Sequence, residues 1–279
     1  MQIAFRTHDL GVKGLDNAIN KLHACNINAV QLVAYKFLDE IKYAPDELND
    51  LNTLAIGSAL SAAGINVPLI GAYFNPVHSD KEKVARCKQV FKEYLKYSQN
   101  LGCNIVGSET GSFNDDKWTY NPLNRTEEAL QTVIATFKEL AEYAKSVGAF
   151  VGMEGAAGHV CWNVATLKRA IDEIAADNIK VIFDIYNYLD AENYSQYLDI
   201  LDEGLKTFAG KIHIFHIKDC VFEDGKLKQV APSKGMFDFE KILGKIKAYD
   251  KNATLVLEGT TGDDIVPCSE FIREVWNRV

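Results

Sequence analysis

The chain contains 279 residues, of which 47% are hydrophobic and 24% charged, with 38 acidic against 30 basic side chains. A chain of this size and composition buries a full hydrophobic core, which excludes an intrinsically disordered acidic segment. The formal net charge of −8 argues against nucleic-acid binding, because that function needs a basic surface to neutralise phosphates.

The sequence carries no sign of a membrane or secretory segment. No stretch approaches the roughly 20 uninterrupted apolar residues of a membrane span, and the first residues lack the regions of a signal peptide. Six cysteines occur without a C-x-x-C pair, which argues against a zinc ribbon and against a disulfide framework. We therefore expect a soluble, cytoplasmic protein that does not bind membranes.

Short apolar runs alternate with longer amphipathic segments along the whole chain. Eight runs are predicted strands: Gln2–Arg6, Ala29–Ala34, Asn66–Phe74, Asn104–Ser108, Phe150–Glu154, Val181–Asp184, Ile212–Ile217 and Thr254–Glu258. The helices predicted to follow them are Leu15–Cys25, Glu47–Ala63, Lys81–Leu101, Glu127–Val147, Val164–Ala176, Gln196–Phe208, Glu240–Ala248 and Ser269–Trp276.

Eight successive βα units predict an α/β protein with one (β/α)8 TIM barrel, which spans residues 1–279 as a single domain. A doubly wound open sheet is the alternative fold. It is disfavoured because no G-x-G-x-x-G follows the first strand and no Walker motif occurs.

Ionisable residues stand near the ends of the last four predicted strands, namely Glu154, Asp184, His216 and Glu258. The active sites of TIM barrels lie at the carboxyl ends of the strands, and these four strands are expected to be neighbours. Three converging carboxylates would repel one another unless a cation neutralised them. Oxygen ligands with one imidazole suit Mn²⁺ or Mg²⁺ and are compatible with Zn²⁺ or Co²⁺. We expect Mn²⁺.

Each of these residues also has an ordinary structural interpretation. A single acidic residue at a strand end is more often a helix cap or half of an ion pair, and a single histidine is more often a hydrogen-bonded core residue. The occurrence of all four at corresponding positions on consecutive strands favours a site. By the alternation of the strand, His213 is expected to point outward to the helices and to be structural.

Four short motifs carry a resemblance to a known group of proteins: Glu154-Gly155-x-x-x-His159, Asp184-x-x-Asn187, His216-x-Lys218-Asp219 and Leu257-Glu258-Gly259. Together they resemble the xylose isomerase-like barrel superfamily and, within it, the sugar phosphate isomerase/epimerase family related to ketose 3-epimerases. The resemblance extends over essentially the whole chain. It implies one divalent metal ion held by the four strand-end residues, with Glu154 and Glu258 also acting as acid and base. Ketose 3-epimerases usually have a histidine where this chain has Asn187.

Such a site predicts proton transfer next to a carbonyl group. A metal ion that chelates a ketone oxygen and a neighbouring hydroxyl acidifies the adjacent C–H and stabilises the enediolate formed by its deprotonation. We therefore predict a metal-dependent enzyme, an isomerase or epimerase, that acts on a keto sugar or sugar phosphate. Two bases on opposite faces give epimerisation, whereas one base gives aldose–ketose isomerisation.

Several alternatives stay open at this point. A lyase that dehydrates a keto-inositol would use the same enolate, and an apurinic-site endonuclease-like hydrolase has the same barrel. A non-catalytic sugar-binding module is a third possibility, although it gives three converging carboxylates no purpose. The partner is expected to be a small-molecule sugar, and the sequence leaves open whether the chain forms a homo-oligomer.

A second group of residues is predicted to contact substrate. His159 and Asn187 follow ligand-bearing strands and are candidates for binding hydroxyl groups, and Lys218 would bind an oxyanion or pair with an acidic neighbour. Glu109, after the fourth strand, would orient substrate or support the rim. Further candidates for the pocket lining are Arg6, His8, Trp118 and Trp162. The run Gly259–Gly262 offers backbone N–H groups for a phosphate.

Overall fold

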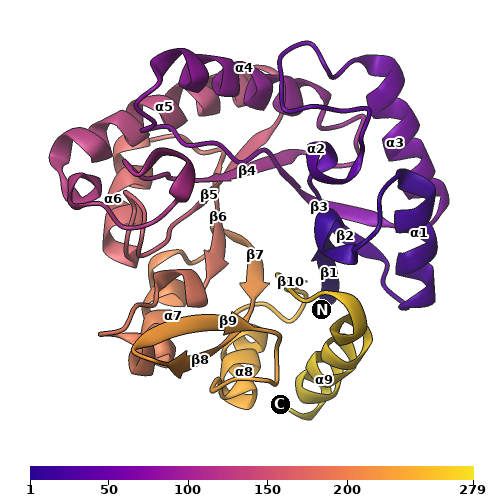
Figure 1. The fold of residues 1–279 in the computed structure, drawn as a ribbon, viewed down its shortest axis with the longest axis vertical. Helices are drawn as coiled ribbons and strands as arrows, with labels where there is room; N and C mark the ends of the chain where they lie inside the picture. The colour runs from indigo at the N-terminus through magenta and orange to yellow at the C-terminus, as the bar shows by residue number, and fades with distance from the viewer.

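Eight parallel strands close into a barrel in the computed structural model, which describes residues 1–279 (Figure 1). The order around the ring is β1-β10-β7-β6-β5-β4-β3-β2. The strands are β1 (Gln2–Arg6), β2 (Ala29–Leu32), β3 (Asn66–Gly71), β4 (Ile105–Glu109), β5 (Phe150–Glu154), β6 (Ile179–Asp184), β7 (Ile212–Ile217) and β10 (Thr254–Leu257). The predicted (β/α)8 TIM barrel is confirmed.

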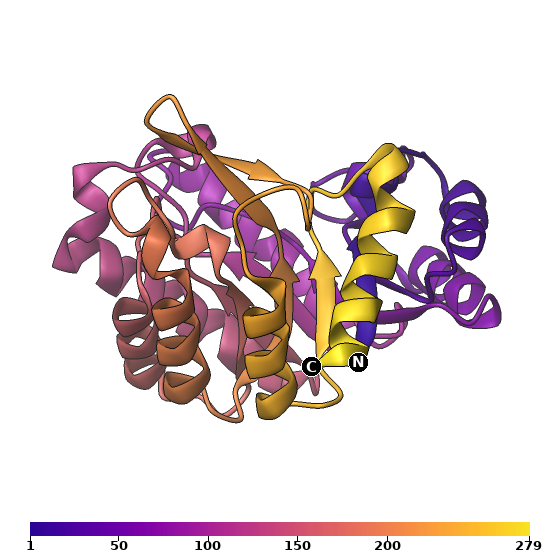
Figure 2. The same cartoon turned by 90° about the horizontal axis from the view of Figure 1, so that it is seen from below.

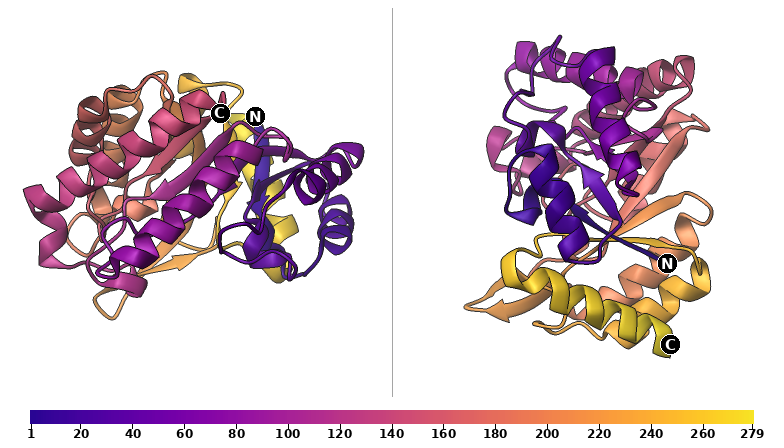
Figure 3. Two further views of the ribbon diagram at one scale, coloured as in Figure 1. Left: turned by 90° about the horizontal axis from the view of Figure 1, so that it is seen from above. Right: turned by 90° about the vertical axis from the view of Figure 1, so that its right-hand side faces the viewer.

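Helices surround the barrel and bury their apolar faces against it (Figures 1 and 3). In α6, for example, Val164, Leu167, Ile171 and Ile174 are buried, which is the spacing of one helical face. The helices are α1 (Leu15–Ala24), α2 (Ala34–Phe37), α3 (Asp50–Ala62), α4 (Lys81–Tyr97), α5 (Glu127–Ser146), α6 (Val164–Ile174), α7 (Tyr197–Thr207), α8 (Phe239–Tyr249) and α9 (Ile265–Arg278). None of them is both long enough and apolar enough to cross a bilayer.

One contiguous cluster of 79 buried residues extends from Ile3 to Trp276, so the chain has a single core. The predicted elements differ from the observed ones mainly at their ends. Strand β3 ends at Gly71 rather than Phe74, and Ala34 begins the short helix α2 rather than ending a strand. Ala72 and Phe74 are buried although they lie beyond β3, so the apolar pattern of the sequence continues past the end of the strand.

A two-stranded antiparallel hairpin, β8 (Asp219–Glu223) and β9 (Lys226–Val230), stands above the carboxyl ends of the barrel strands (Figure 2). Sequence analysis predicts no strand there. The buried carboxylate of Asp219 closes this insertion, because it accepts hydrogen bonds from the backbone N–H groups of Cys220, Gly235 and Phe237 at 2.8, 2.8 and 3.1 Å. From β9, the side-chain amide of Gln229 donates to the backbone oxygen of Glu258 at 3.0 Å.

The predicted outward orientation of His213 is wrong. The register between β6 and β7 shifts after the pair Val181 and Ile212, and Ile182 then pairs with Ile214, so His213 is the extra residue of a bulge. Its Nε2 lies 2.7 Å from the carbonyl oxygen of Pro68 on β3, which is on the opposite side of the ring. His213 therefore lies across the amino-terminal end of the barrel, far from the strand-end carboxylates.

Candidate metal and substrate site

Four residues of adjacent strands converge at the mouth of the barrel. Glu154 ends β5, Asp184 ends β6, His216 lies near the end of β7, and Glu258 follows the last residue of β10. The register pairs Asp184 with His216, and the closed ring places β5, β6, β7 and β10 side by side. One ligand atom from each of the four lies within 4.8 Å of the others. The convergence expected from the sequence is thus present.

The imidazole of His216 is at the centre of this group. Its Nδ1 lies 2.9 Å from Glu258 Oε2, 3.1 Å from Glu154 Oε1 and 3.8 Å from Asp184 Oδ2. The His216 side chain is fully buried. A single ring nitrogen therefore faces all three carboxylates.

Two further cations balance the carboxylates. Lys218 is buried, and its Nζ lies 2.9 Å from Asp184 Oδ2 and 2.9 Å from Glu258 Oε1. Arg6 donates to Glu258 Oε1 at 2.6 Å and to Asp9 at 2.7 Å. The cationic charge that the three carboxylates require is thus supplied in part by side chains of the protein, and Lys218 pairs with acidic neighbours, which is one of the two roles considered from the sequence.

The donor set nevertheless fits a divalent cation. At bond lengths of about 2.1 Å, neighbouring ligand atoms around a metal ion lie roughly 3 to 4 Å apart. The distances from His216 Nδ1 to the three carboxylates, 2.9, 3.1 and 3.8 Å, are close to this range. Asp184 Oδ2 is buried, and its nearest partner is the ammonium of Lys218 at 2.9 Å. A buried carboxylate oxygen and an imidazole nitrogen that face each other are a suitable ligand pair for a cation.

The charges of the cluster and its neighbours shift the pKa values of His216 and Glu258. Burial alone would lower the pKa of His216, but Glu154 and Glu258 outweigh it and raise the pKa to about 10. Burial opposes ionisation of Glu258, yet Lys218, His216 and Arg6 hold its pKa well below the usual range. Glu258 is therefore the anionic partner of three cationic side chains.

A cavity of about 370 Å³ opens beside this cluster, and it is the space available to a substrate. Its lining combines aromatic rings with charged groups: Arg6, Tyr35, Lys36, Tyr73, Glu109, Trp118, Glu154 and Glu258. Arg6, Glu109 and Trp118 were expected there. Sequence analysis missed Tyr35, Lys36 and Tyr73, because they lie in the segments after β2 and β3, which carry no strand-end motif.

Glu109 differs from the other carboxylates of the cavity. It pairs in register with Glu154 on the neighbouring strand. Burial, together with the charges of Glu154 and Glu258, raises the pKa of Glu109 from 4.5 to about 8. In the absence of a bound cation, Glu109 is thus mainly a neutral acid at pH 7.

The remaining candidate residues lie deeper or further away. Asn187 donates to Glu154 Oε1 at 2.7 Å and accepts from Lys218 at 2.9 Å, so it connects two members of the cluster. His159 is 4% exposed, packs edge to face on Trp118, and does not line the cavity. Contact of either side chain with a substrate hydroxyl stays a prediction.

In the run Gly259–Gly262 after β10, considered from the sequence as a phosphate cradle, one of the backbone N–H groups is bonded within the protein, and phosphate binding there stays a prediction. The N–H of Gly259 donates to Asp9 at 2.9 Å, and the side chain of Gln229 covers this glycine. That N–H group is thus already occupied within the protein.

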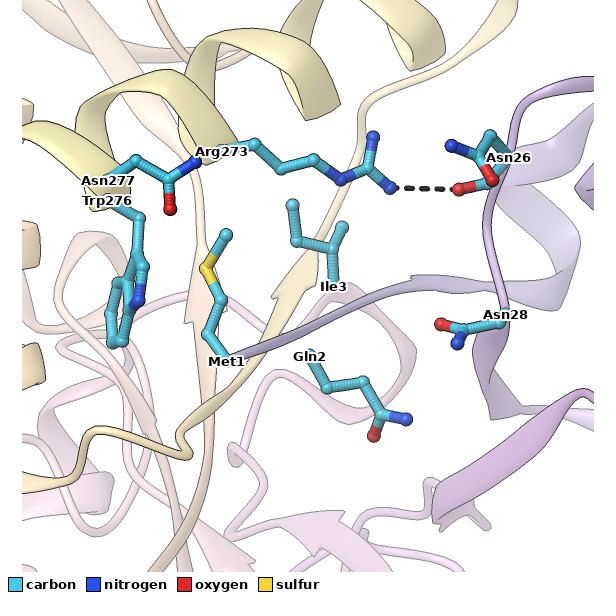
Figure 4. A pocket seen from close by; sticks show the side chains of 8 residues that line it. All are labelled: Met1, Gln2, Ile3, Asn26, Asn28, Arg273, Trp276 and Asn277. Atoms are coloured by element: carbon cyan, nitrogen blue, oxygen red, sulfur yellow. Dashed lines mark hydrogen bonds between the residues drawn. The ribbon is translucent and has the colours of Figure 1, made fainter.

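A second cavity, of about 540 Å³, lies at the other end of the barrel, between the start of β1 and α9 (Figure 4). There Arg273 donates to the backbone oxygen of Asn26 at 2.9 Å. The lining contains no carboxylate or histidine: Met1, Gln2, Ile3, Asn26, Asn28, Arg273, Trp276 and Asn277. This cavity offers no acid or base, so we place the candidate active site at the barrel mouth.

Comparison with known proteins agrees with the geometry. The sequence profile of the xylose isomerase-like TIM barrel family matches residues 19–274. The chain belongs to the xylose isomerase-like TIM barrel family. This match confirms the family resemblance that was noted from four short motifs. No curated protein sequence matches this chain.

Solved structures with the same fold superpose over the whole chain. A D-tagatose 3-epimerase-like protein has a TM-score of 0.76 at 18% identity, with coverage of 100% of this chain and 98% of that chain. A D-psicose 3-epimerase studied in the presence of D-fructose has a TM-score of 0.70 at 16% identity, with coverage of 100% and 98%. An IolI protein with a bound zinc atom has a TM-score of 0.74 at 14% identity, with coverage of 100% and 99%. At these identities the likeness establishes a common fold.

The buried position of Lys218 predicts that its charge stabilises the metal-free protein. Lys218→Met removes the nearest cation from buried Asp184 and one of the three cationic partners of Glu258, and we expect a loss of about 3–5 kcal/mol in the free energy of unfolding. Saturating Mn²⁺ should restore part of this loss, because a cation supplies the missing charge. Urea unfolding with EDTA or with Mn²⁺ measures both effects.

The matched control is Lys228→Met, which removes the half-exposed partner of Glu223 on the hairpin. We expect this control to change the free energy of unfolding by less than about 1 kcal/mol. A similar loss in both variants would show that the buried lysine does not have the role assigned to it.

The pKa of Glu109 predicts a pH dependence of stability. The folded protein holds the Glu109 proton up to about pH 8, whereas the unfolded chain releases it near 4.5. Relative to Glu109→Gln, the metal-free wild type should therefore lose free energy of unfolding as the pH rises between these values, by up to about 1.4 kcal/mol per pH unit. Urea unfolding in EDTA measures this, with exposed Glu128→Gln as the control. Parallel profiles for wild type and Glu109→Gln would refute the shifted pKa.

Proposed function

We propose that this protein is a divalent-metal-dependent sugar isomerase or epimerase that moves a proton at the carbon next to a carbonyl group. The observation that carries the proposal is the cluster of Glu154, Asp184, His216 and Glu258, two of whose members, Glu154 and Glu258, border a cavity of about 370 Å³. A cavity of this size falls within the usual range of small-molecule sites. We further propose that the protein acts in the cytoplasm on a keto sugar or a sugar phosphate.

The four strand-end residues would hold the metal ion, for which we propose Mn²⁺, with Mg²⁺, Co²⁺ and Zn²⁺ as alternatives. When bound, such an ion polarises the carbonyl group of the substrate and makes the adjacent C–H more acidic. The relatives support this proposal, since several are named as epimerases and one is named for its bound zinc.

The protein's own residues supply the proton transfers. Glu154 and Glu258 both border the cavity, so each is in place to take a proton from a bound substrate or to return one. Removal by one carboxylate and return by the other from the opposite face inverts the carbon. Arg6 and Lys218 hold Glu258 at the wall, and Asn187 does the same for Glu154.

A dehydratase reaction is the second candidate, and one observation favours it. Glu109 borders the cavity, and its burial raises its pKa, so it is placed to donate a proton to a leaving hydroxyl group. Elimination would follow the same first proton removal. Product analysis distinguishes the two reactions, because only the dehydratase releases water.

The two-base proposal predicts deuterium exchange. In deuterated water, Mn²⁺-loaded wild type should place deuterium on the carbon next to the carbonyl of its substrate, drawn from a panel of ketopentoses and ketohexoses with and without a terminal phosphate. Glu154→Gln and Glu258→Gln should each lower epimerisation by at least about 100-fold, because each removes a general base. Nuclear magnetic resonance of the sugar measures exchange and epimerisation together.

Metal content has to be measured in each variant, because the same residues are the proposed ligands. A metal-loaded variant that exchanges one face of the substrate but no longer inverts it supports two bases. Full turnover in either metal-loaded variant would contradict the assignment, and Glu109 would then be the next residue to replace.

Lys36 predicts a preference for an anionic substrate. Its ammonium borders the cavity, 5.8 Å from the centroid of the Tyr73 ring, and takes no part in the ion pairs that hold Arg6 and Lys218. We expect Lys36→Gln to raise the KM for a ketose phosphate roughly tenfold, about 1.4 kcal/mol, and to leave the unphosphorylated sugar unchanged. Lys36→Arg, which keeps the charge, is the control. An equal change in KM for both sugars would exclude this role.

A further inference from the structure

Gln31 is a fully buried amide within an otherwise apolar strand. It lies on β2, between Val30 and Leu32, and has 0% exposure. A buried amide is costly unless its oxygen and nitrogen both find hydrogen-bond partners. Because β2 lies three places from β7 around the ring, one partner of Gln31, His216, lies across the barrel, whereas the other, Tyr73, follows the neighbouring strand β3.

Both ends of the Gln31 amide are paired. Its Oε1 lies 2.8 Å from Nε2 of His216, and its Nε2 donates to the hydroxyl oxygen of Tyr73 at 2.5 Å. An amide oxygen only accepts hydrogen bonds, so the His216 nitrogen that faces it carries a proton. The other ring nitrogen, Nδ1, is the one that faces Glu154 and Glu258.

We propose that Gln31 is the positioning residue that keeps the Nε2 of His216 protonated and its Nδ1 directed to the carboxylate cluster, with the Tyr73 hydroxyl as the second hydrogen-bond partner of the Gln31 amide. This inference rests on the proposed metal-dependent function, because Nδ1 is then the nitrogen available to a cation. The opposite orientation of the amide would place an N–H group against His216 Nε2 and move the ring proton to Nδ1. That tautomer has no lone pair to offer a cation.

Tyr73 connects this chain of hydrogen bonds to the cavity. Its ring lines the cavity together with Glu109 and Glu258, while its oxygen accepts the hydrogen bond from Gln31. Three side chains from three elements, Tyr73, Gln31 and His216, thus form one continuous link from the cavity wall to the cluster. The proton of the Tyr73 hydroxyl is directed away from Gln31, because the oxygen is already the acceptor of that bond.

The chemistry of the partner sets the expected effects. Groups that hold the distal N–H of a metal-binding histidine usually change metal affinity about 10- to 100-fold when they are removed. A neutral amide orients the ring, and a carboxylate in its place would also increase the basicity of the imidazole. Gln31→Leu and Gln31→Glu should therefore act in opposite directions.

The test uses Co²⁺ as the probe, because its binding is visible by absorbance and by calorimetry. We expect Gln31→Leu to weaken Co²⁺ binding about 10- to 100-fold and Gln31→Glu to bind at least as tightly as wild type. The matched control is Asn178→Leu, which removes another buried amide, bonded to the backbone of Ala141 and Ala149. This control should lower stability without changing Co²⁺ affinity.

A second measurement does not depend on the folding of a variant. In Zn²⁺-loaded wild type labelled with ¹⁵N-histidine, the His216 signals should show a protonated Nε2 and an unprotonated Nδ1. A protonated Nδ1 in that sample would overturn the proposal, and so would Co²⁺ affinity in Gln31→Leu within twofold of wild type. Failure of wild type to bind either cation would instead overturn the proposed metal-dependent function, and this inference with it.

Discussion

The mouth of the barrel brings three carboxylates to one imidazole nitrogen, and the balance of charge around that nitrogen governs the site. The protein supplies a protonated His216, a buried Lys218 and the guanidinium of Arg6. A divalent cation would take the place of the proton on His216 Nδ1, which lies 3.8 Å from the buried Oδ2 of Asp184. A metal ion that binds here would therefore replace the His216 proton in a site that already contains positive charge.

The same ion pairs close the ring. Arg6 ends β1, and its partner Glu258 follows β10, so this contact joins the first and last strands of the barrel. Asp9 strengthens the junction, because it accepts from Arg6 and from the N–H of Gly259. A residue proposed for proton transfer is thus also part of the seam between the two ends of the chain, which ties the geometry of the site to the closure of the fold.

The sequence was sufficient to predict the barrel and the convergence of Glu154, Asp184, His216 and Glu258, because strand-end position follows from periodicity and adjacency follows from the order of the strands.

The sequence was not sufficient to predict the role of Gln31. A single polar residue in an apolar strand resembles an ordinary interruption of the pattern until its contact with His216 is seen. Two cavity residues were also missed, Lys36 in the short helix α2 and Tyr73 just after β3, because neither stands in a strand-end motif. The bulge at His213 reversed a side chain that strict alternation had placed outside, and no residue type in β7 marks that bulge.

The hairpin after β7 is held firmly at its base, so its tip can change in length without moving the site below it. Asp219 fixes the base of the insertion through three backbone hydrogen bonds, and Gln229 fixes β9 to the peptide of Glu258. The turn at Asp224 and Gly225, by contrast, is exposed, and a side chain added at Gly225 would meet no other atom within 4 Å. Each doubling of a flexible loop costs only about 0.6 kcal/mol in closure entropy. Residues added at this turn would extend the wall above the mouth at small cost, which makes the hairpin tip the place where evolution or design can change the entrance while the chemistry beneath it stays intact.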